Sequence, residues 1–481
     1  EHSPSDWIRV LIDSFNDRRT AYEFAVNPAG VKQDRYWFND GNNDRGWDAV
    51  WDVATSRTEQ GWQAEFRIPF SQLRFPRQHD GRMGFAVMRE VARLNETSTW
   101  PLVAMSRVGI VSQFGQLTNL SPGAAPKRLE LVPYSVARVT LNPAGDNPLV
   151  EGTDPDAVAG LDLKYALTPG LTLTATVNPD FGQVEADPAV VNLSAFETFF
   201  PERRPFFVEG SGNFRFDLDC EDDSCTGLFY SRRIGRQPQV EAAVSEDGDV
   251  VAPPQTTILG ASKLTGRVGQ FSVGVLHAIT QEERADVREP GVLDTRATVE
   301  PLTSYTVVRA RREFGNQSNV GFMMTATNRA LSDTLRPTLA DQAYTGGVDV
   351  DFRLTPKYRV SGYWAGSTIH GAADAIASLQ ENSRHYFQRP DADHVEFDPS
   401  RTSLSGHAGQ AAVDKIGGER VRFRSGYSFK SPGFDINDVG YVRLADRRNV
   451  SNWMQVRYLT PTSWYRSVRV NFNQWAGWNY G

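Results

Sequence analysis

The connections between strands constrain this fold most, because short and long connections alternate after about residue 128. Short turns are expected near 168–170, 265–270, 313–319, 355–357 and 460–463, and long excursions near 142–160, 178–256, 280–303, 328–343 and 366–418. In an antiparallel series, this alternation brings the long loops to one end. Outer-membrane β-barrels show that asymmetry. We therefore expect an antiparallel transmembrane β-barrel of about thirteen strands, incomplete at its C-terminus.

The strands themselves alternate apolar and polar residues, as strands with one apolar and one polar face do. Residues 161–167 alternate in this way, and residues 171–177 repeat the pattern after a Thr-Pro-Gly turn. Residues 348–354 and 358–364 form a second such pair around Thr355-Pro-Lys357. A large soluble β-protein is the alternative, although it has no reason to keep its long loops at one end.

Composition and charge argue against several classes of protein. The net charge of -7, with no run of basic residues, argues against nucleic acid as a partner. No stretch of eighteen apolar residues is present, so a transmembrane helix is not expected. The chain starts at Glu1 and does not end on a strand with a terminal aromatic, so we expect a fragment or a processed form.

At 481 residues, two domains are expected. Residues 1–120 alternate in short strands, for example 62–68, and predict a partial β-sandwich. Residues 121–127 are a plausible linker, and residues 128–481 form the barrel domain with a long inserted segment at 178–256.

Cysteine and histidine usage adds little catalytic chemistry. Cys220 and Cys225 lie in an acidic loop and suit a local disulfide in an oxidising compartment; two free thiols are the alternative. Zinc is not expected, because no second Cys or His pair accompanies them. Four histidines fall in the expected excursion 366–418 and are predicted to be solvated: His370, His385, His394 and His407.

The segment 178–210 carries six carboxylates and six phenylalanines, which is too polar for a core strand and too aromatic for a linker. We expect it to fill or line a cavity formed by the rest of the chain. Its acids could form ion pairs inside a barrel, hold a hard cation such as calcium, or act as paired catalytic carboxylates. The candidates for catalysis are Asp180, Glu185, Asp187, Glu197, Glu202 and Glu209; those for a metal are Asp180, Glu185 and Asp187. Candidate ligand-binding cations are Arg203, Arg204, Arg232 and Arg233.

A second cluster lies near residue 45, where aromatic and acidic residues alternate. Flat indole faces beside carboxylates are what sugar recognition needs. The candidates are Trp37, Trp47, Trp51, Asp44 and Asp48. The alternative is that the tryptophans are core residues and the acids a solvated turn. A calcium loop of the EF-hand type starting at Asp40 fails, because its twelfth position is Trp51.

Two stretches resemble known families. The run from Asp13 to Phe75, with AYEFAVNPAG and WDAVWDVATSRTEQGWQAEFRIPFSQLRF, resembles the second half of a family 9 carbohydrate-binding-like module whose first strands are absent. The run from Asn178 through FFPERRPFFVEG to Gly235 resembles the outer-membrane β-barrel domain of unknown function that follows such modules in Gram-negative bacteria.

The resemblance implies a jelly-roll-like sandwich joined to a barrel in the outer membrane, in contact with lipid, with the N-terminal domain on the periplasmic side. A non-enzymatic protein that binds or passes a glycan or another ligand is the leading hypothesis. A surface glycoside hydrolase using the carboxylates within 180–209 and a plugged structural barrel are the alternatives. No cofactor is expected, apart from the calcium considered above.

Overall fold

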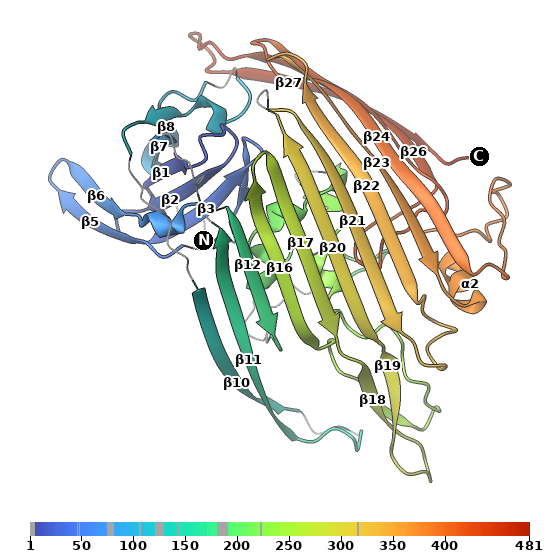
Figure 1. Ribbon diagram of the computed structural model, residues 1–481. Coiled ribbons are helices and arrows are strands. Elements are labelled where there is room, and N and C mark those ends of the chain that lie inside the picture. The colour runs from blue at the N-terminus through green and yellow to red at the C-terminus, as the bar shows by residue number, and fades with distance from the viewer. Residues whose placement is uncertain are drawn as a thin grey trace.

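The computed structural model describes residues 5–45, 47, 49–74, 81–104, 107–120, 129–142, 145, 147–168, 170–179, 191–221, 224–314 and 317–481. The fold is all-β: one large antiparallel sheet, a smaller N-terminal sheet, and an irregular segment packed inside the large sheet (Figure 1). No helix among the described residues is long and apolar enough to cross a membrane.

The large sheet, here called the wall, has thirteen strands, which confirms the expected number. β10 and β27 are its two ends, and they do not pair with each other within the described residues. In spatial order the strands are β10 (Leu129–Leu141), β11 (Thr153–Thr168), β12 (Leu171–Val177), β16 (Ile258–Val268), β17 (Phe271–Thr280), β20 (Leu302–Glu313), β21 (Asn319–Ala330), β22 (Gln342–Arg353), β23 (Tyr358–His370), β24 (Ser403–Lys415), β25 (Val421–Lys430), β26 (Arg447–Tyr458) and β27 (Val468–Trp478).

Short and long connections do alternate along the wall. Because its neighbouring strands are antiparallel, the short turns, such as 354–357 and 416–420, share one end and the long loops share the other. Two of the expected long loops include residues that form strands. β11 begins at Thr153, inside the expected excursion 142–160, and β24 lies inside the expected excursion 366–418.

The two faces of the wall differ in what they contact. Each of the thirteen strands exposes at least one large apolar side chain on the outside, for example Phe322 and Met324 on β21 and Trp364 on β23. On β21 the alternate positions point inward, as Met323 does, and are buried. This is the period of two that was expected from the sequence.

The N-terminal sheet, here called the module, has the order β4-β3-β2-β1-β7-β8, with β9 paired to β7. Its strands are β1 (Trp7–Asp13), β2 (Ala21–Val26), β3 (Lys32–Phe38), β4 (Asn42–Asp44), β7 (Met83–Val91), β8 (Glu96–Trp100) and β9 (Gly115–Leu117). The hairpin of β5 (Asp52–Thr58) and β6 (Gly61–Arg67) covers one face, so the module has two layers. All six residues of β2 are buried, because separate hydrophobic clusters lie on its two faces. Three short 3-10 helices complete the module: η1 (Phe70–Gln72), η2 (Ala92–Leu94) and η3 (Val111–Gln113).

Residues 191–221 and 224–240, here called the plug, lie on the inner side of the wall (Figure 1, green). The plug contains α1 (Pro205–Val208), η4 (Ser211–Phe214), β13 (Asp217–Glu221), β14 (Ser224–Gly227) and η5 (Ser231–Arg233). At the long-loop end lie α2 (Ala373–Glu381) and a sheet of β15 (Asp249–Val251), β18 (Glu283–Arg288) and β19 (Thr295–Glu300). Residues 431–446, between β25 and β26, are here called the inward loop, because they pack against the plug.

Candidate functional site

An apolar core joins the plug to the wall. Phe216 and Leu228 of the plug, Met323 and Tyr363 of the wall and Phe434 of the inward loop all belong to one buried cluster. The wall leaves room for it: a Cβ added at Gly347 of β22 would lie 2.8 Å from the ring of Phe216. A segment that is strongly acidic and aromatic in sequence is therefore ordered by its phenylalanines, which supply the buried apolar area.

Arg204 and Glu202 form the first polar centre of the plug. Arg204 is 9% exposed, and its Nε and one terminal nitrogen donate to the two carboxylate oxygens of Glu202 at 2.9 and 2.7 Å. The remaining donors reach the carbonyls of Ile234 and Ser231, both at 2.7 Å. The guanidinium also stacks over Phe207 at 4.3 Å. One arginine thus ties the start of α1 to the region after β14.

The acid of this pair is held ionised. Burial by itself would raise the pKa of Glu202, but the Arg204 guanidinium and the Ser231 hydroxyl outweigh it and hold the pKa below its ordinary value. Backbone N–H groups of Arg203 and Arg204 also donate to Glu202, both at 2.9 Å. Glu202 is therefore a fixed acceptor, and it is a poor source of protons.

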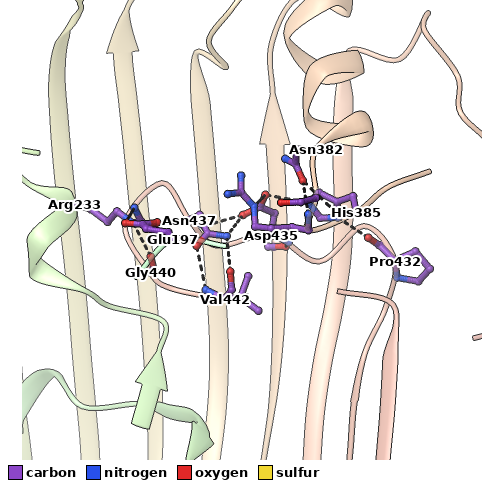
Figure 2. A network of polar contacts seen from close by, with 12 residues as sticks. Glu197, Arg233, Asn382, His385, Pro432, Asp435, Asn437, Gly440 and Val442 are labelled. Carbon is purple, nitrogen blue, oxygen red and sulfur yellow. Dashed lines mark hydrogen bonds and ion pairs between the residues drawn. The ribbon is translucent and has the colours of Figure 1, made fainter. Parts of the chain in front are cut away.

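Arg233 forms the second centre, which links the plug to the inward loop (Figure 2). It is 5% exposed and binds Glu197 through two parallel hydrogen bonds of 2.8 and 2.7 Å. It also donates to the carbonyl of Gly440 at 3.0 Å and to Oδ1 of Asn437 at 3.1 Å. Such bidentate, charge-assisted contacts fix direction as well as distance.

Asn437 carries the network on to the long loop after β23 (Figure 2). Its side-chain amide donates to Asp435 at 2.9 Å, and Asp435 accepts from Nε2 of His385 at 3.0 Å. Nδ1 of His385 faces the carbonyl of Pro432 at 2.7 Å. Burial alone would raise the pKa of Asp435, but Arg384 and His385 hold it well below its ordinary value. The expectation that His385 is solvated was wrong. Its side chain is 2% exposed, because the loop around α2 folds back over the inward loop.

Polar side chains of the wall hold the plug from the other side. Lys263 of β16 donates to the carbonyls of Phe206 and Glu209. The hydroxyl of Tyr363 donates to the carbonyl of Leu218 at 3.3 Å. Lys430 of β25 pairs with Asp219 at 2.7 Å. The plug is thus attached to strands on both sides of its core.

Of the carboxylates predicted as catalytic, the three that lie among the described residues are engaged by different cations. Glu197 and Glu202 pair with different arginines, and Glu209 pairs with Lys164 at 2.6 Å. Burial would raise the pKa of Glu209, yet Lys164 and Lys263 lower it below its ordinary value. Arg232 donates to the carbonyl of Pro201 at 2.8 Å. Asp48, Asp180, Glu185 and Asp187 lie outside the described residues.

The tryptophans near residue 45 belong to the interior of the module. Trp37 and Trp51 are 7% and 2% exposed, and their indole N–H groups donate to Glu23 and Asp34. Trp47 packs on Tyr22, with ring centroids 4.8 Å apart. A role for these residues in sugar binding stays a prediction.

Trp47 and the predicted Asp44 line a narrow cavity between the module and the turn end of the wall. Tyr22, Arg267 and Glu209 also line it. Its volume of about 50 Å³ is room for a few waters. Small-molecule pockets are larger, about 300 Å³ or more.

The structure joins Cys220 and Cys225 in a disulfide between β13 and β14. Asp217 lies close to both sulfurs, but a disulfide has no thiolate to offer a metal.

Sequence reasoning missed the inward loop as a partner of the plug. Tyr230 donates its N–H to the carbonyl of Val439 at 2.8 Å, and Tyr441 donates to Gly227 at 3.1 Å. The available signal was a series of apolar residues interspersed with Asp, Asn and Gly, too irregular for a strand, from Phe434 to Val442.

These observations define the class of protein: a curved antiparallel wall with an apolar outer face and a plug bound to its inner face. Residues 125–480 match the model of a domain of unknown function, DUF5916, and the chain belongs to this family. The match does not extend to the N-terminal residues, so the likeness to a carbohydrate-binding module stays an expectation.

No curated protein matches the chain. Among solved structures, the chain is similar to Acinetobacter baumannii OccAB3, at 8% identity and a TM-score of 0.28, covering 98% of this chain and 93% of that one. It is similar to Pseudomonas aeruginosa OccK2 (OpdF) in complex with glucuronate, at 9% identity and a TM-score of 0.26, with coverage of 98% and 93%. The FrpB iron transporter from Neisseria meningitidis is similar at 10% identity and a TM-score of 0.30, with coverage of 95% and 68%. At these TM-scores the alignments carry no functional correspondence.

Proposed function

We propose that this protein is an outer-membrane β-barrel protein that binds or passes a ligand through a lumen partly occupied by its own plug. One observation carries the proposal: all thirteen strands turn apolar side chains outward, while the inner face of the strands between β16 and β24 packs on the plug. An exposed apolar surface of this extent is a liability in water, but it is what lipid contact requires.

The plug favours a gated or receptor role over an open pore. Its apolar core and its arginine-centred networks attach it to the wall, the inward loop and the loop around α2. Displacing the plug would expose buried phenylalanines and break charge-assisted hydrogen bonds. Ligand movement therefore depends on space beside the plug or on a rearrangement of it.

The hydrolase alternative has weaker support. A glycosidase needs one carboxylic acid whose pKa is raised, so that it can protonate the leaving group. Glu202 and Glu209 have their pKa values lowered by neighbouring cations, and Glu197 is engaged by Arg233. This arrangement supports a structural network of ion pairs.

The proposed orientation places the module on the periplasmic side. The module packs against the short-turn end of the wall, where Arg267 of β16 pairs with Asp17 of the module and, at 2.7 Å, with Glu313 of β20. Short turns of outer-membrane barrels face the periplasm.

Two measurements on the purified protein in detergent test this function. A folded barrel migrates differently on a denaturing gel before and after boiling, and we expect that shift. In planar lipid bilayers we expect little steady conductance, because the plug obstructs the lumen. A protein that stays soluble without detergent and shows no shift contradicts the barrel, and a large, permanently open conductance contradicts the plugged lumen.

A further inference from the structure

Three strands of the wall present an inner face that differs from the face under the plug. Ala408 of β24 belongs to the core between plug and wall, and Lys430, directly opposite it on β25, reaches Asp219 of the plug. Directly opposed residues of antiparallel strands share a face. The register therefore identifies the inward positions of β25, β26 and β27.

Every charged residue at these inward positions is a cation. The six are Arg422, Arg424, Lys430, Arg447, Arg457 and Arg469, and β25, β26 and β27 contain no Asp or Glu at any position. Arg424 donates to Asp414 of β24 at 3.1 Å, and Lys430 pairs with Asp219 of the plug.

Around the next cation, backbone oxygens are the partners. Arg457 donates to the carbonyls of Gly418 and Glu419 at 2.7 and 3.1 Å, and neither carries a formal charge. Arg469 lies directly opposite Arg457 and is exposed. Among the described residues, neither Arg457 nor Arg469 has an acid within ion-pair distance, so these two positive charges lie together near the short-turn end.

Aromatic and amide groups share the same face. Trp453 and Trp475 point inward, and Trp475 is 77% exposed. Gln455 donates to Asn471 at 3.0 Å, and Asn473 lies beside Trp453. Indole faces stack on sugar rings, side-chain amides bind hydroxyls, and arginine binds carboxylates through two bonds.

The apolar core that the described residues form between plug and wall does not extend to this face, where the ion pair of Lys430 with Asp219 contacts the plug. Within the part of the chain that the structure describes, the buried core between plug and wall includes residues of β16 to β24 and of the inward loop, and none of β25, β26 or β27. On these three strands, all of whose residues are described, the buried core has no counterpart of the apolar wall residues that meet the plug, such as Val307 and Met323.

We propose that the inner face of β25–β27 binds an anionic, hydroxylated ligand of the sugar-acid class, beside the plug. This inference rests on the proposed barrel function and names the class of ligand that its lumen takes. It also moves the expected glycan contact away from the module, where the predicted Trp37 and Trp51 are buried.

The test compares D-galacturonate with D-galactose, which differ in the carboxylate, by calorimetry on the intact protein in detergent. We expect galacturonate to bind at least about tenfold tighter, because a charge-assisted hydrogen bond to arginine contributes that much. The double variant Arg422→Gln, Arg469→Gln should lower galacturonate affinity by about tenfold or more. Arg466→Gln, which removes one charge from the exposed turn between β26 and β27, is the matched control and should bind as the parent does.

Equal binding of the two sugars, no binding of either, or full binding by the double variant overturns the sugar-acid site. The heat-dependent gel shift is recorded on the same samples. A preparation that keeps the shift but does not bind galacturonate defeats this inference alone, whereas a preparation without the shift defeats the barrel itself. A double variant that has lost the shift is replaced by Trp475→Ala, which should weaken galacturonate binding and leave the shift intact.

Discussion

At the scale of single residues, Arg233 does more to hold the plug than its exposed neighbours. Arg233→Ala removes the side-chain donor to the Gly440 carbonyl and the cation that pairs with Glu197, and we expect a loss of about 3 kcal/mol in unfolding free energy. Arg215→Ala is the control, because the Arg215–Asp217 pair is partly exposed and contributes about 1 kcal/mol or less. Urea unfolding followed by gel migration measures both. Equal losses in the two variants would contradict the assigned role.

Glu202 makes the attachment of the plug sensitive to acid. Its pKa is lower in the folded protein than in the unfolded chain, so its contribution is present above the unfolded pKa and is lost as pH falls through the folded pKa. We expect plug stability to hold between about pH 7 and pH 5 and to fall below about pH 4. Glu202→Gln should flatten that fall at the cost of stability at neutral pH. The urea unfolding midpoint, measured across this pH range, tests this prediction. If the midpoint of the variant falls with pH as steeply as that of the parent, Glu202 is not the group responsible.

At the scale of elements, the fit between plug and wall depends on a glycine of β22. A methyl group at Gly347 would approach the ring of Phe216 to 2.8 Å, whereas one at Gly346 has 3.9 Å to its nearest neighbour. Gly347→Ala should therefore loosen the plug by about 1–3 kcal/mol, and Gly346→Ala, on the outer face, should not. Protease sensitivity of residues 200–240 in the folded protein reports the difference. Matching sensitivity in both variants would mean that the ring of Phe216 can move aside.

The same elements show how far sequence could predict the fold. Alternation at 161–177 predicted a hairpin, and Leu163 does pair with Ala175, because the outer face of the pair is apolar and its inner face is polar. β24 was not predicted as a strand, because Ala and Gly occupy many of its positions and large apolar residues do not mark the alternation. The inward loop approaches so closely that a Cβ at Gly406 would lie 2.2 Å from the nitrogen of Phe434.

For the candidate site, composition left ion pairs, a cation site and catalytic carboxylates open for the segment 178–210, and Glu202 forms an ion pair with Arg204. The partners across the barrel could not be predicted. The contacts of Arg233 with Gly440 and of His385 with Asp435 join residues 207 and 50 positions apart, and no local pattern encodes such pairs.

At the scale of the whole molecule, the two ends of the wall should lie on opposite sides of the membrane. Thr58 lies at the tip of the β5–β6 hairpin of the module, and Val292 lies in the exposed connection between β18 and β19 at the long-loop end. In a background where Cys220 and Cys225 remain paired, Val292→Cys should react with a membrane-impermeant thiol reagent on intact cells. Thr58→Cys should react only after the outer membrane is permeabilised, because short turns face the periplasm and the module packs against them. The reverse labelling pattern would invert the proposed orientation, and labelling of both sites on intact cells would place the module at the cell surface.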